Sequence, residues 1–409
     1  MKNYLFLAFA SLLFSSSIFS QKKSSGGAMK YIDRVNMDFS VKPGDNFYEY
    51  ANGNWLKNNA IPNSQTRWGS FNILTETSSQ RLKSISEEAA ANPKKNALMQ
   101  RVGDFYASAM DSAARNKLGF QPIKGRLEDL MNLTTQQQVI NEIAIMRTKG
   151  EGSPLFGFFV AQDAKNATQY MAQLSQGGTS LPDRDYYLKN DPTSQAVRTA
   201  YLSYIKDMFV MTGNTPGVAL KKADEILGLE TGLAKLQMSR VEMRDPIKRY
   251  NKFSVDGLTK ITPGLEWKDL LIAMKVPKQD SILVSNPDFL KGVDALLSAV
   301  PLDTWKAYLQ WSVIKSAADY LSDDFVNRNF KFSQVLTGQK EIEPRWQRAT
   351  NLSDRALGEL IGQLYVEKYF TPAAKARMLT LVENIQQTFG ERIKRLDWMS
   401  EATKQQALT

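Results

Sequence analysis

The chain has 409 residues, of which 43% are hydrophobic, and a formal net charge of +10. A chain of this length buries a sizeable core and is expected to build more than one compact unit, because single hydrophobic cores stop growing near ~250–300 residues. It contains no cysteine and no histidine, which excludes disulfides, thiol redox chemistry and catalytic arrangements of the Ser/His/Asp or Cys/His kind.

The first residues have the pattern of a secretory signal peptide. Within residues 1–20, a basic start at Lys2 precedes an apolar run over Tyr4–Phe14 and a serine-rich end. The alternative, a retained membrane anchor, needs ~18 or more unbroken apolar residues, and serines interrupt this run. We therefore expect an exported, periplasmic or extracellular product that is not an integral membrane protein after cleavage. Residues 21–37 are expected to be a flexible tether, with order beginning near Asp38.

Helical spacing of apolar residues dominates the following part of the chain. The string PGDNFYEYANGNWL (43–56) predicts a helix with Asp45 as its N-cap, in which Asn52-Gly53 marks a turn or a weakened segment. Two more helices are predicted from Gly69 to about Ala91 and from Asn96 to Met110. This region is therefore predicted to be strongly α-helical.

The pattern changes to short β-prone runs over Leu155–Leu174. LFGFFV and YMAQLS are joined by the polar QDAKNATQ, which predicts a hairpin that ends at Gly177-Gly178. After the loop SLPDRDYYL, helices are predicted at Val197–Met211 and Val218–Met238. Five prolines then divide residues 245–301 into shorter pieces.

The last quarter is again predicted to be helical. Helices are expected over Trp305–Leu321 and through the apolar stripe of Leu357–Tyr365. Thr371 and the following proline form the N-terminal cap of the next helix, and Ser400 is the N-cap of a last one, EATKQQALT. This last helix reaches Thr409 without a C-cap signal, so we expect the natural protein to continue.

The sequence contains none of the common catalytic or phosphate-binding motifs. It has no GxxxxGK[ST], GxGxxG, GxSxG, EF-hand or HExxH string. The adjacent acidic pairs Glu87-Glu88 and Asp323-Asp324 point in different directions on a helix and are expected to be solvated, so neither is predicted to be a catalytic dyad. The basic residues are scattered over helical faces, which favours a solvated surface over nucleic-acid binding.

Several longer strings resemble one family in the same order along the chain. The family comprises neprilysin, the endothelin-converting enzymes and the bacterial PepO-type endopeptidases. The matching strings are DNFYEYANGNWLKNNAIP (45–62) with RWGSF (67–71), SLPDRDYYL (180–188), PRWQRA (344–349), LIGQLYVEKYF (360–370) and LDWMSEATKQQAL (396–408). Together they extend over nearly all of residues 38–409, so a chance resemblance of separate turns and aromatic anchors is a poor explanation.

The resemblance implies a mainly α-helical fold, the multi-helix N-terminal cap lobe of a two-lobed zinc metallopeptidase, with a small β-hairpin near 155–174. Residues 38–409 would be this neprilysin-type N-terminal domain. In that family a C-terminal lobe binds zinc through HExxH and a downstream Glu, and zinc activates water for the cleavage of oligopeptides. None of these residues occurs in this sequence. The catalytic zinc domain is therefore expected to be a missing partner, and this chain is expected to have no catalytic or metal-binding residue.

One site residue follows from the resemblance. Arg67, in TRWGSF, occupies the place of an arginine that contacts the C-terminal carboxylate of short substrates in neprilysin-like proteins, a contact suited to a bidentate guanidinium. The alternative is a surface or interlobe ion pair. Asn52 stands where animal members carry a cysteine, which fits a bacterial-type member without the disulfides of that branch.

Two functions remain open from the sequence. In the first, the chain is the substrate-restricting portion of an exported zinc metalloendopeptidase, is inactive alone, and acts on peptide substrates once joined to the catalytic lobe. In the second, it is a free-standing, non-catalytic domain that binds peptides or a partner. The second predicts a soluble protein of this length without an exposed apolar face.

Overall fold

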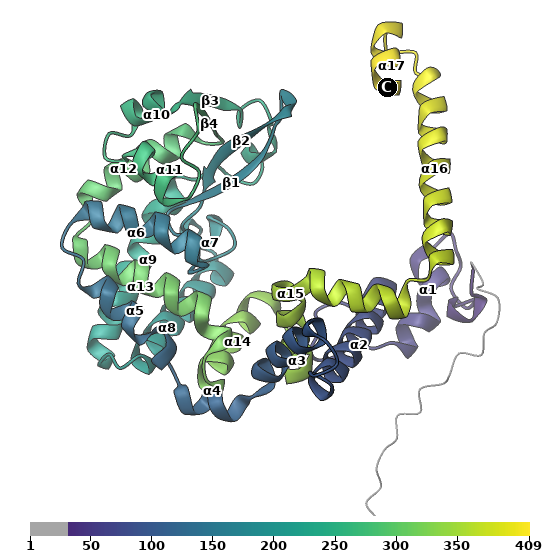
Figure 1. The fold of residues 1–409 in the computed structure, drawn as a ribbon, viewed down its shortest axis with the longest axis horizontal. Helices are drawn as coiled ribbons and strands as arrows, with labels where there is room; N and C mark the ends of the chain where they lie inside the picture. Colours follow the sequence, from purple (N-terminus) through teal and green to yellow (C-terminus); the bar gives the residue numbers. More distant parts are fainter. Residues whose placement is uncertain (1–31) are drawn as a thin grey trace, which may run out of the picture. The chain divides into compact units, whose positions relative to one another are not determined.

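The computed structural model describes residues 32–409 (Figure 1). The predicted signal peptide, residues 1–20, lies outside the described residues, as do residues 21–31 of the predicted tether. The chain divides into two compact units, one ending at Ile61 and one comprising Pro62–Thr409. Both are built mainly from helices, which confirms the predicted fold class.

The first unit contains a short 3-10 helix, η1 (Arg34–Asn36), and helix α1 (Phe47–Asn58). The N-cap of α1 is Asn46, one residue after the predicted Asp45, because the Asn46 side chain accepts a hydrogen bond from the Glu49 amide at 3.1 Å. The helix thus begins one residue later than the sequence suggested.

Gly53 continues α1 instead of ending it. A Cβ at this position would lie 2.7 Å from the Asp38 Cβ, so glycine permits a close approach between α1 and the preceding segment. The Asp38 carboxylate accepts hydrogen bonds from Lys57 and Ser40, and these lower its pKa to about 2. The predicted weak segment is therefore a packing position.

Three helices of the second unit pack against one another: α2 (Ser70–Ala91), α3 (Ala97–Met110) and α15 (Arg345–Tyr369). The first two agree with the predicted ranges to within a residue. Their shared core consists of buried apolar side chains: Ile85, Ala89, Met99, Val102, Ile361 and Leu364. Non-helical dihedral angles at Leu357 (φ −127°, ψ 26°) interrupt α15.

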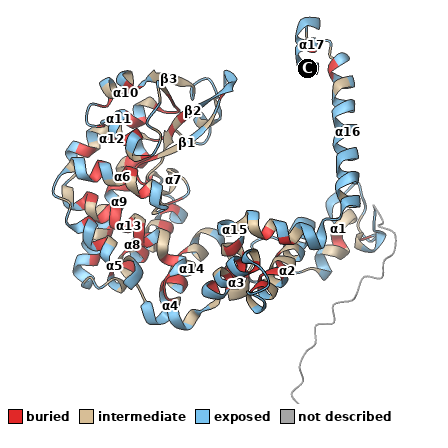
Figure 2. Cartoon of the chain, in the orientation of Figure 1, coloured by how far each residue is buried: buried red, intermediate tan, exposed pale blue. Residues whose placement is uncertain are grey.

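A larger helical body contains the main hydrophobic core, which includes the fully buried Trp267, Trp305 and Trp311. In Figure 2 the buried residues, in red, concentrate on its central helices. Helix α8 begins earlier than predicted, at Pro192, because Asp191 caps it by accepting from the Ser194 amide at 2.9 Å. The other helices are α4 (Ser112–Leu118), α5 (Gln121–Met131), α6 (Gln136–Lys149), α7 (Asp185–Leu188), α9 (Pro216–Leu236), α10 (Val255–Ile261), α11 (Trp267–Ala273), α12 (Pro287–Ala299), α13 (Leu302–Ala317) and α14 (Asp323–Thr337).

The predicted hairpin is part of a four-stranded mixed sheet. Strands β1 (Phe156–Asp163) and β2 (Asn166–Gln176) pair antiparallel, as predicted. The sequence did not indicate β3 (Asn251–Ser254) and β4 (Ser281–Val284), which complete the order β1-β2-β4-β3. Strand β4 pairs parallel with β2 and antiparallel with β3. Its three pairs with β2 link segments about a hundred residues apart.

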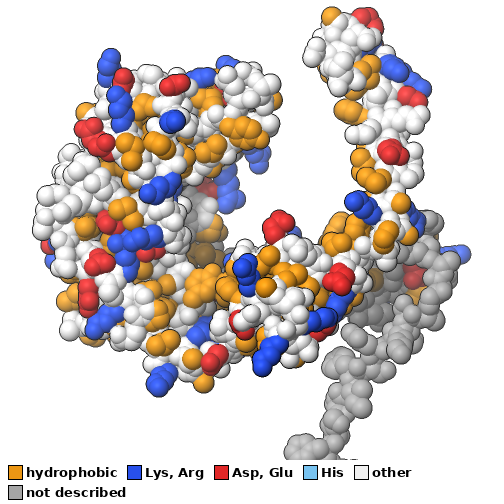
Figure 3. Space-filling model, viewed as in Figure 1, with side chains coloured by type: hydrophobic (Ala, Val, Ile, Leu, Met, Phe, Trp, Pro, Cys, Tyr) orange, Lys and Arg blue, Asp and Glu red, His pale blue; other side chains and the backbone are white. Residues whose placement is uncertain are grey.

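The last two helices are α16 (Pro372–Lys394) and α17 (Glu401–Leu408), with the predicted N-caps Thr371 and Ser400. Ile393 is the single buried residue of α16. Several of its apolar side chains are about half exposed: Met378, Leu379, Leu381, Val382, Ile385 and Phe389. Figure 3 shows hydrophobic side chains, in orange, along this helix. No helix of the described residues combines the length and apolar character needed to cross a membrane.

Candidate functional site

Arg67 lies in the segment that leads into α2. It is exposed, and its side chain takes part in no hydrogen bond or ion pair with the other described residues. The preceding residue, Thr66, lines a cavity of about 700 Å³. Arg67 follows the lining segment Ser64–Thr66 directly in the chain but is not itself one of the lining residues, and its role in substrate binding stays a prediction.

Contacts with a distant segment hold the chain around Arg67. The Asn63 carbonyl accepts hydrogen bonds from the amides of Lys340 and Glu341, both at 3.0 Å. The Asn63 side-chain amide donates to the Glu341 carboxylate at 2.8 Å, and the Gln339 side chain donates to the Ser64 carbonyl at 3.0 Å. The segment between α14 and α15 thus fixes the loop that carries the candidate substrate-binding arginine.

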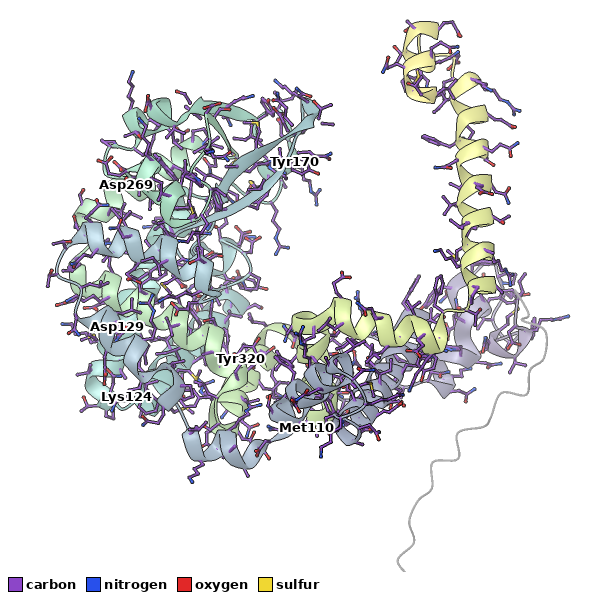
Figure 4. All side chains as sticks on the ribbon, viewed as in Figure 1. Met110, Lys124, Asp129, Tyr170, Asp269 and Tyr320 are labelled. Carbon is purple, nitrogen blue, oxygen red and sulfur yellow. The ribbon has the colours of Figure 1, made fainter. Side chains whose placement is uncertain are left out.

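Arg345, the arginine of the PRW string, connects three helices beside the cavity. Its Nε donates to the Met110 carbonyl at 2.9 Å, and its Nη2 donates to the Ala109 carbonyl at 3.2 Å. Both carbonyls belong to the last turn of α3, where backbone acceptors lack helical partners (Met110 is labelled in Figure 4). Its Nη1 pairs with the Asp323 carboxylate, in the first turn of α14, at 3.2 Å.

Residues of α4 contact the start of α14 beside Arg345. Arg115 donates to the Leu321 carbonyl at 2.6 Å, and Asn116 exchanges hydrogen bonds with the side chain and the amide of Asp323, at 2.9 and 2.8 Å. The hydrogen bond from Asn116 and then the nearby Arg345 hold the pKa of Asp323 below its ordinary value. Asp323, expected to be a solvated surface carboxylate, therefore ties α4, α14 and α15 together.

Two residues of the string SLPDRDYYL bind a buried carboxylate that was not among the predicted site residues. Glu230 of α9 is fully buried and accepts hydrogen bonds from Ser180 at 2.7 Å, Tyr187 at 2.6 Å and Tyr201 at 2.9 Å. Burial raises the pKa of Glu230 above its ordinary value, although the positive charge of Lys315 and then the three hydroxyl donors oppose this shift. One signal was available, because Glu230 follows Ile226 by four residues on the apolar face of its helix.

The donor set does not fit a catalytic zinc ion. Imidazole nitrogen and thiolate sulfur are absent from the sequence. Within residues 32–409, no three acidic side chains come close enough together to hold a metal. The cavity itself is lined by four arginines and three acidic residues. A guanidinium with free N–H groups is suited to binding anionic groups of a ligand.

Comparisons with known proteins agree with the resemblance. Endothelin-converting enzyme-like 1 of Rattus norvegicus is 27% identical over 399 residues, which cover 94% of this chain and 51% of that protein. Endothelin-converting enzyme 1 of the same organism is 27% identical over 383 residues, which cover 91% and 50%. The chain thus spans about half the length of these curated relatives.

Solved structures show the same fold. The zinc metalloprotease Zmp1 of Mycobacterium tuberculosis, in complex with an inhibitor, superposes with a TM-score of 0.83 at 30% identity, over 92% of this chain and 57% of that one. PepO from Lactobacillus rhamnosis superposes with a TM-score of 0.74 at 22% identity, over 90% and 58%. The model of Peptidase family M13 matches residues 43–409. The chain therefore belongs to peptidase family M13.

Proposed function

We propose that the chain forms the N-terminal, substrate-restricting portion of an exported zinc metalloendopeptidase that cleaves oligopeptides, and that it is inactive alone. One observation carries the proposal: a chain that matches a metallopeptidase family over residues 43–409 has no imidazole or thiolate with which to hold the metal. Zinc and the catalytic glutamate would come from a second lobe, since this chain spans only about half of its relatives.

The exposed face of α16 supports such a partner. Ile385 and Phe389 are 59% and 65% exposed, although they recur at the spacing of a helix that packs against another surface. Leaving such a continuous apolar stripe in water is unfavourable, by roughly 25 cal/mol for each Å² of apolar surface. A free-standing binding domain predicts that no such face exists, so α16 favours the first function.

Within this proposal, Arg67 binds the C-terminal carboxylate of the substrate. Its side chain is exposed, the residues directly before it line a cavity, and the hydrogen bond between Asn63 and Glu341 holds its loop. A guanidinium that is free of intramolecular partners within the described chain can present two parallel N–H donors to a carboxylate. The alternative is an ion pair with the catalytic lobe.

The experiment for Arg67 uses the enzyme produced from this chain together with the coding region that follows it. Arg67→Gln is expected to raise KM about ten-fold or more for a peptide with a free C-terminal carboxylate, since a charged hydrogen bond contributes roughly 1.5–3 kcal/mol. The same peptide with an amidated C-terminus should be cleaved equally well by both enzymes. Arg101→Gln, at an exposed position of α3, is the matched control.

Equal losses for the free and the amidated peptide would contradict carboxylate binding by Arg67. A loss of thermal stability without a change in KM would instead identify Arg67 as half of an ion pair with the second lobe. Both results leave the assignment of the zinc to another lobe untouched, because that assignment concerns the donor set and not Arg67.

A further inference from the structure

The cavity of about 700 Å³ lined by Ser64–Thr66 has more arginines than acidic residues in its walls. Its walls come from the segment at Ser64–Thr66, from α4, from η3 (Ala318–Tyr320) with α14, and from the first turns of α15 (Tyr320 is labelled in Figure 4). Four arginines line it, namely Arg115, Arg345, Arg348 and Arg355, together with three acidic residues, Asp319, Glu343 and Asp354. An arginine can bind a ligand here only if its guanidinium is not already engaged in hydrogen bonds or ion pairs within the chain.

Two of the arginines are engaged with backbone carbonyls. Arg345 uses all three of its guanidinium nitrogens, for Ala109, Met110 and Asp323. Arg115 uses Nε and Nη2. These two side chains hold helices together and have little capacity left for a ligand.

Arg348 is different. It is partly buried, and within the described residues its one hydrogen bond runs from Nε to the Glu343 carbonyl at 3.1 Å. That bond orients the guanidinium and leaves both terminal nitrogens for another acceptor. Seven residues further along the same side of α15, Arg355 is exposed at the cavity and has no ion-pair partner among the described residues.

The surroundings of Arg348 favour an added negative charge. Burial, followed by the positive charge of Arg345, lowers the pKa of Arg348, and the same two causes lower the pKa of Arg115. Arg345 and Arg348 are the first and fourth residues of α15. They therefore lie near the positive end of the helix dipole, which disfavours cations and favours anions.

The acidic residues of the cavity do not neutralise Arg348 directly. Asp319 accepts a hydrogen bond from the Asn329 side chain at 2.7 Å, and Glu343 accepts one from Asn351 at 3.3 Å. Asp354 is exposed. Within residues 32–409, none of the three forms an ion pair with Arg348.

From this geometry we propose that the cavity is a second carboxylate-binding site for the peptide, in which Arg348 forms a bidentate contact and Arg355 supplies an additional positive charge at the rim. The proposal rests on the proposed function in one respect, that the ligand is a peptide. It differs from the role of Arg67, because it concerns a separate guanidinium that α15 holds in place. The carboxylate can belong to an acidic side chain or to a peptide C-terminus, which share the same chemistry.

Isothermal titration of the purified 409-residue chain tests the proposal with three peptides. Acetyl-Ala-Glu-Ala-amide carries a side-chain carboxylate, acetyl-Ala-Gln-Ala carries a C-terminal one, and acetyl-Ala-Gln-Ala-amide carries none. We expect at least one of the first two to bind, and the third to bind about ten-fold more weakly or not at all. The tighter of the first two identifies the source of the carboxylate.

The variants separate Arg348 from its neighbours. Arg348→Gln should weaken binding of the carboxylate peptide about ten-fold or more. Arg348→Lys should retain part of the binding, because an ammonium keeps the charge but lacks the planar fork. Arg355→Gln should weaken binding less than Arg348→Gln does. Arg101→Gln should bind as the unchanged chain does. Circular dichroism and the unfolding temperature verify that each variant is folded, and Arg355→Gln, at an exposed position, remains informative if Arg348→Gln unfolds.

Three results would overturn the proposal. In the first, no carboxylate peptide binds at millimolar concentration, and in the second, binding survives in both Arg348→Gln and Arg355→Gln. Loss of binding in Arg67→Gln alone would also overturn it and would place the carboxylate at Arg67. These results are distinct from a failure of the proposed function, which would be seen as zinc binding and peptide hydrolysis by this chain.

Discussion

Glu230 is a carboxylate removed from water whose hydrogen-bond partners come from separate parts of the chain. Ser180 and Tyr187 belong to the SLPDRDYYL segment, and Tyr201 belongs to α8. A buried charged group is unfavourable unless it is well hydrogen-bonded, and here three hydroxyl groups supply those bonds. The carboxylate thereby fixes the loop after the hairpin to two helices of the main body.

The raised pKa of Glu230 predicts a pH dependence of stability. A carboxyl whose pKa is higher in the folded than in the unfolded state stabilises the fold at low pH, and this contribution is lost as the pH rises from the ordinary value of 4.5 through the raised one. Glu230→Gln resembles the protonated form and removes this titration. We expect the urea midpoint of the unchanged chain to fall, relative to that of the variant, between pH 4 and pH 7.

Urea unfolding of both proteins at several pH values, followed by tryptophan fluorescence, provides the measurement. A midpoint difference that stays constant with pH would show that Lys315 and the hydroxyl donors balance burial, and one that grows in favour of the unchanged chain would show that they outweigh it. The pKa of Glu230 would then not be raised.

Single residues differ in how far the sequence predicts them. The N-caps Thr371 and Ser400 were predicted, because capping depends on a side chain and an amide a few residues away. The pairing of Asp323 with Arg345 was not, and neither was that of Glu88 with Lys368, because those contacts form only when the fold brings distant helices together. Arg345 and Arg348 share this limit, since PRWQRA shows their identity but not their partners.

At the scale of elements, α2 and α3 approach closely at Gly103. A Cβ on this residue would lie 2.4 Å from the Ala89 carbonyl oxygen and 2.5 Å from its carbonyl carbon. Both are backbone atoms of α2, so they cannot move aside as a flexible side chain would. The helices would have to separate to admit even one methyl group.

We therefore expect Gly103→Ala to destabilise the protein by about 1–3 kcal/mol, a cost of overpacking that exceeds the helix-propensity gain of alanine. Gly228→Ala is the matched control, since Gly228 is an exposed position inside α9 with no atom within 4 Å of a built Cβ. The control should stabilise by up to about 1 kcal/mol. Urea unfolding of both variants measures the sign of each change in the free energy of unfolding. Equal changes in the two variants would contradict the close approach of α2 and α3.

The sequence predicts elements well where the signal is local and long. The ranges of α2 and α3 and the β1–β2 hairpin follow from periodicity and turn residues. Strands β3 and β4 have four residues each and form only through pairing with each other and with β2, so no local pattern indicates them. The same holds for the interruption at Leu357, which lies inside an apolar stripe.

At the scale of the whole molecule, the apolar face of α16 predicts how the isolated chain behaves. We expect it to bind a hydrophobic dye and to self-associate, because the exposed face includes Leu379, Ile385 and Phe389. Replacing these three residues by Gln should reduce both dye binding and association while far-ultraviolet circular dichroism stays unchanged. Arg377→Gln with Glu383→Gln, at exposed polar positions of the same helix, is the control.

An unchanged dye signal in the triple variant would show that α16 is not the apolar surface through which the chain associates. It would remove the structural support for a second lobe that docks there, although the family assignment would stand on residues 43–409.

The most direct test of the central claim is the zinc content and peptidase activity of the purified 409-residue chain. After incubation with zinc and dialysis, metal analysis is expected to find far less than one ion per chain, because the sequence offers neither imidazole nor thiolate. Quenched fluorescent peptides should remain uncleaved, and cleavage should appear when the following coding region is included. One zinc ion per chain, with hydrolysis that a chelator abolishes, would contradict the account.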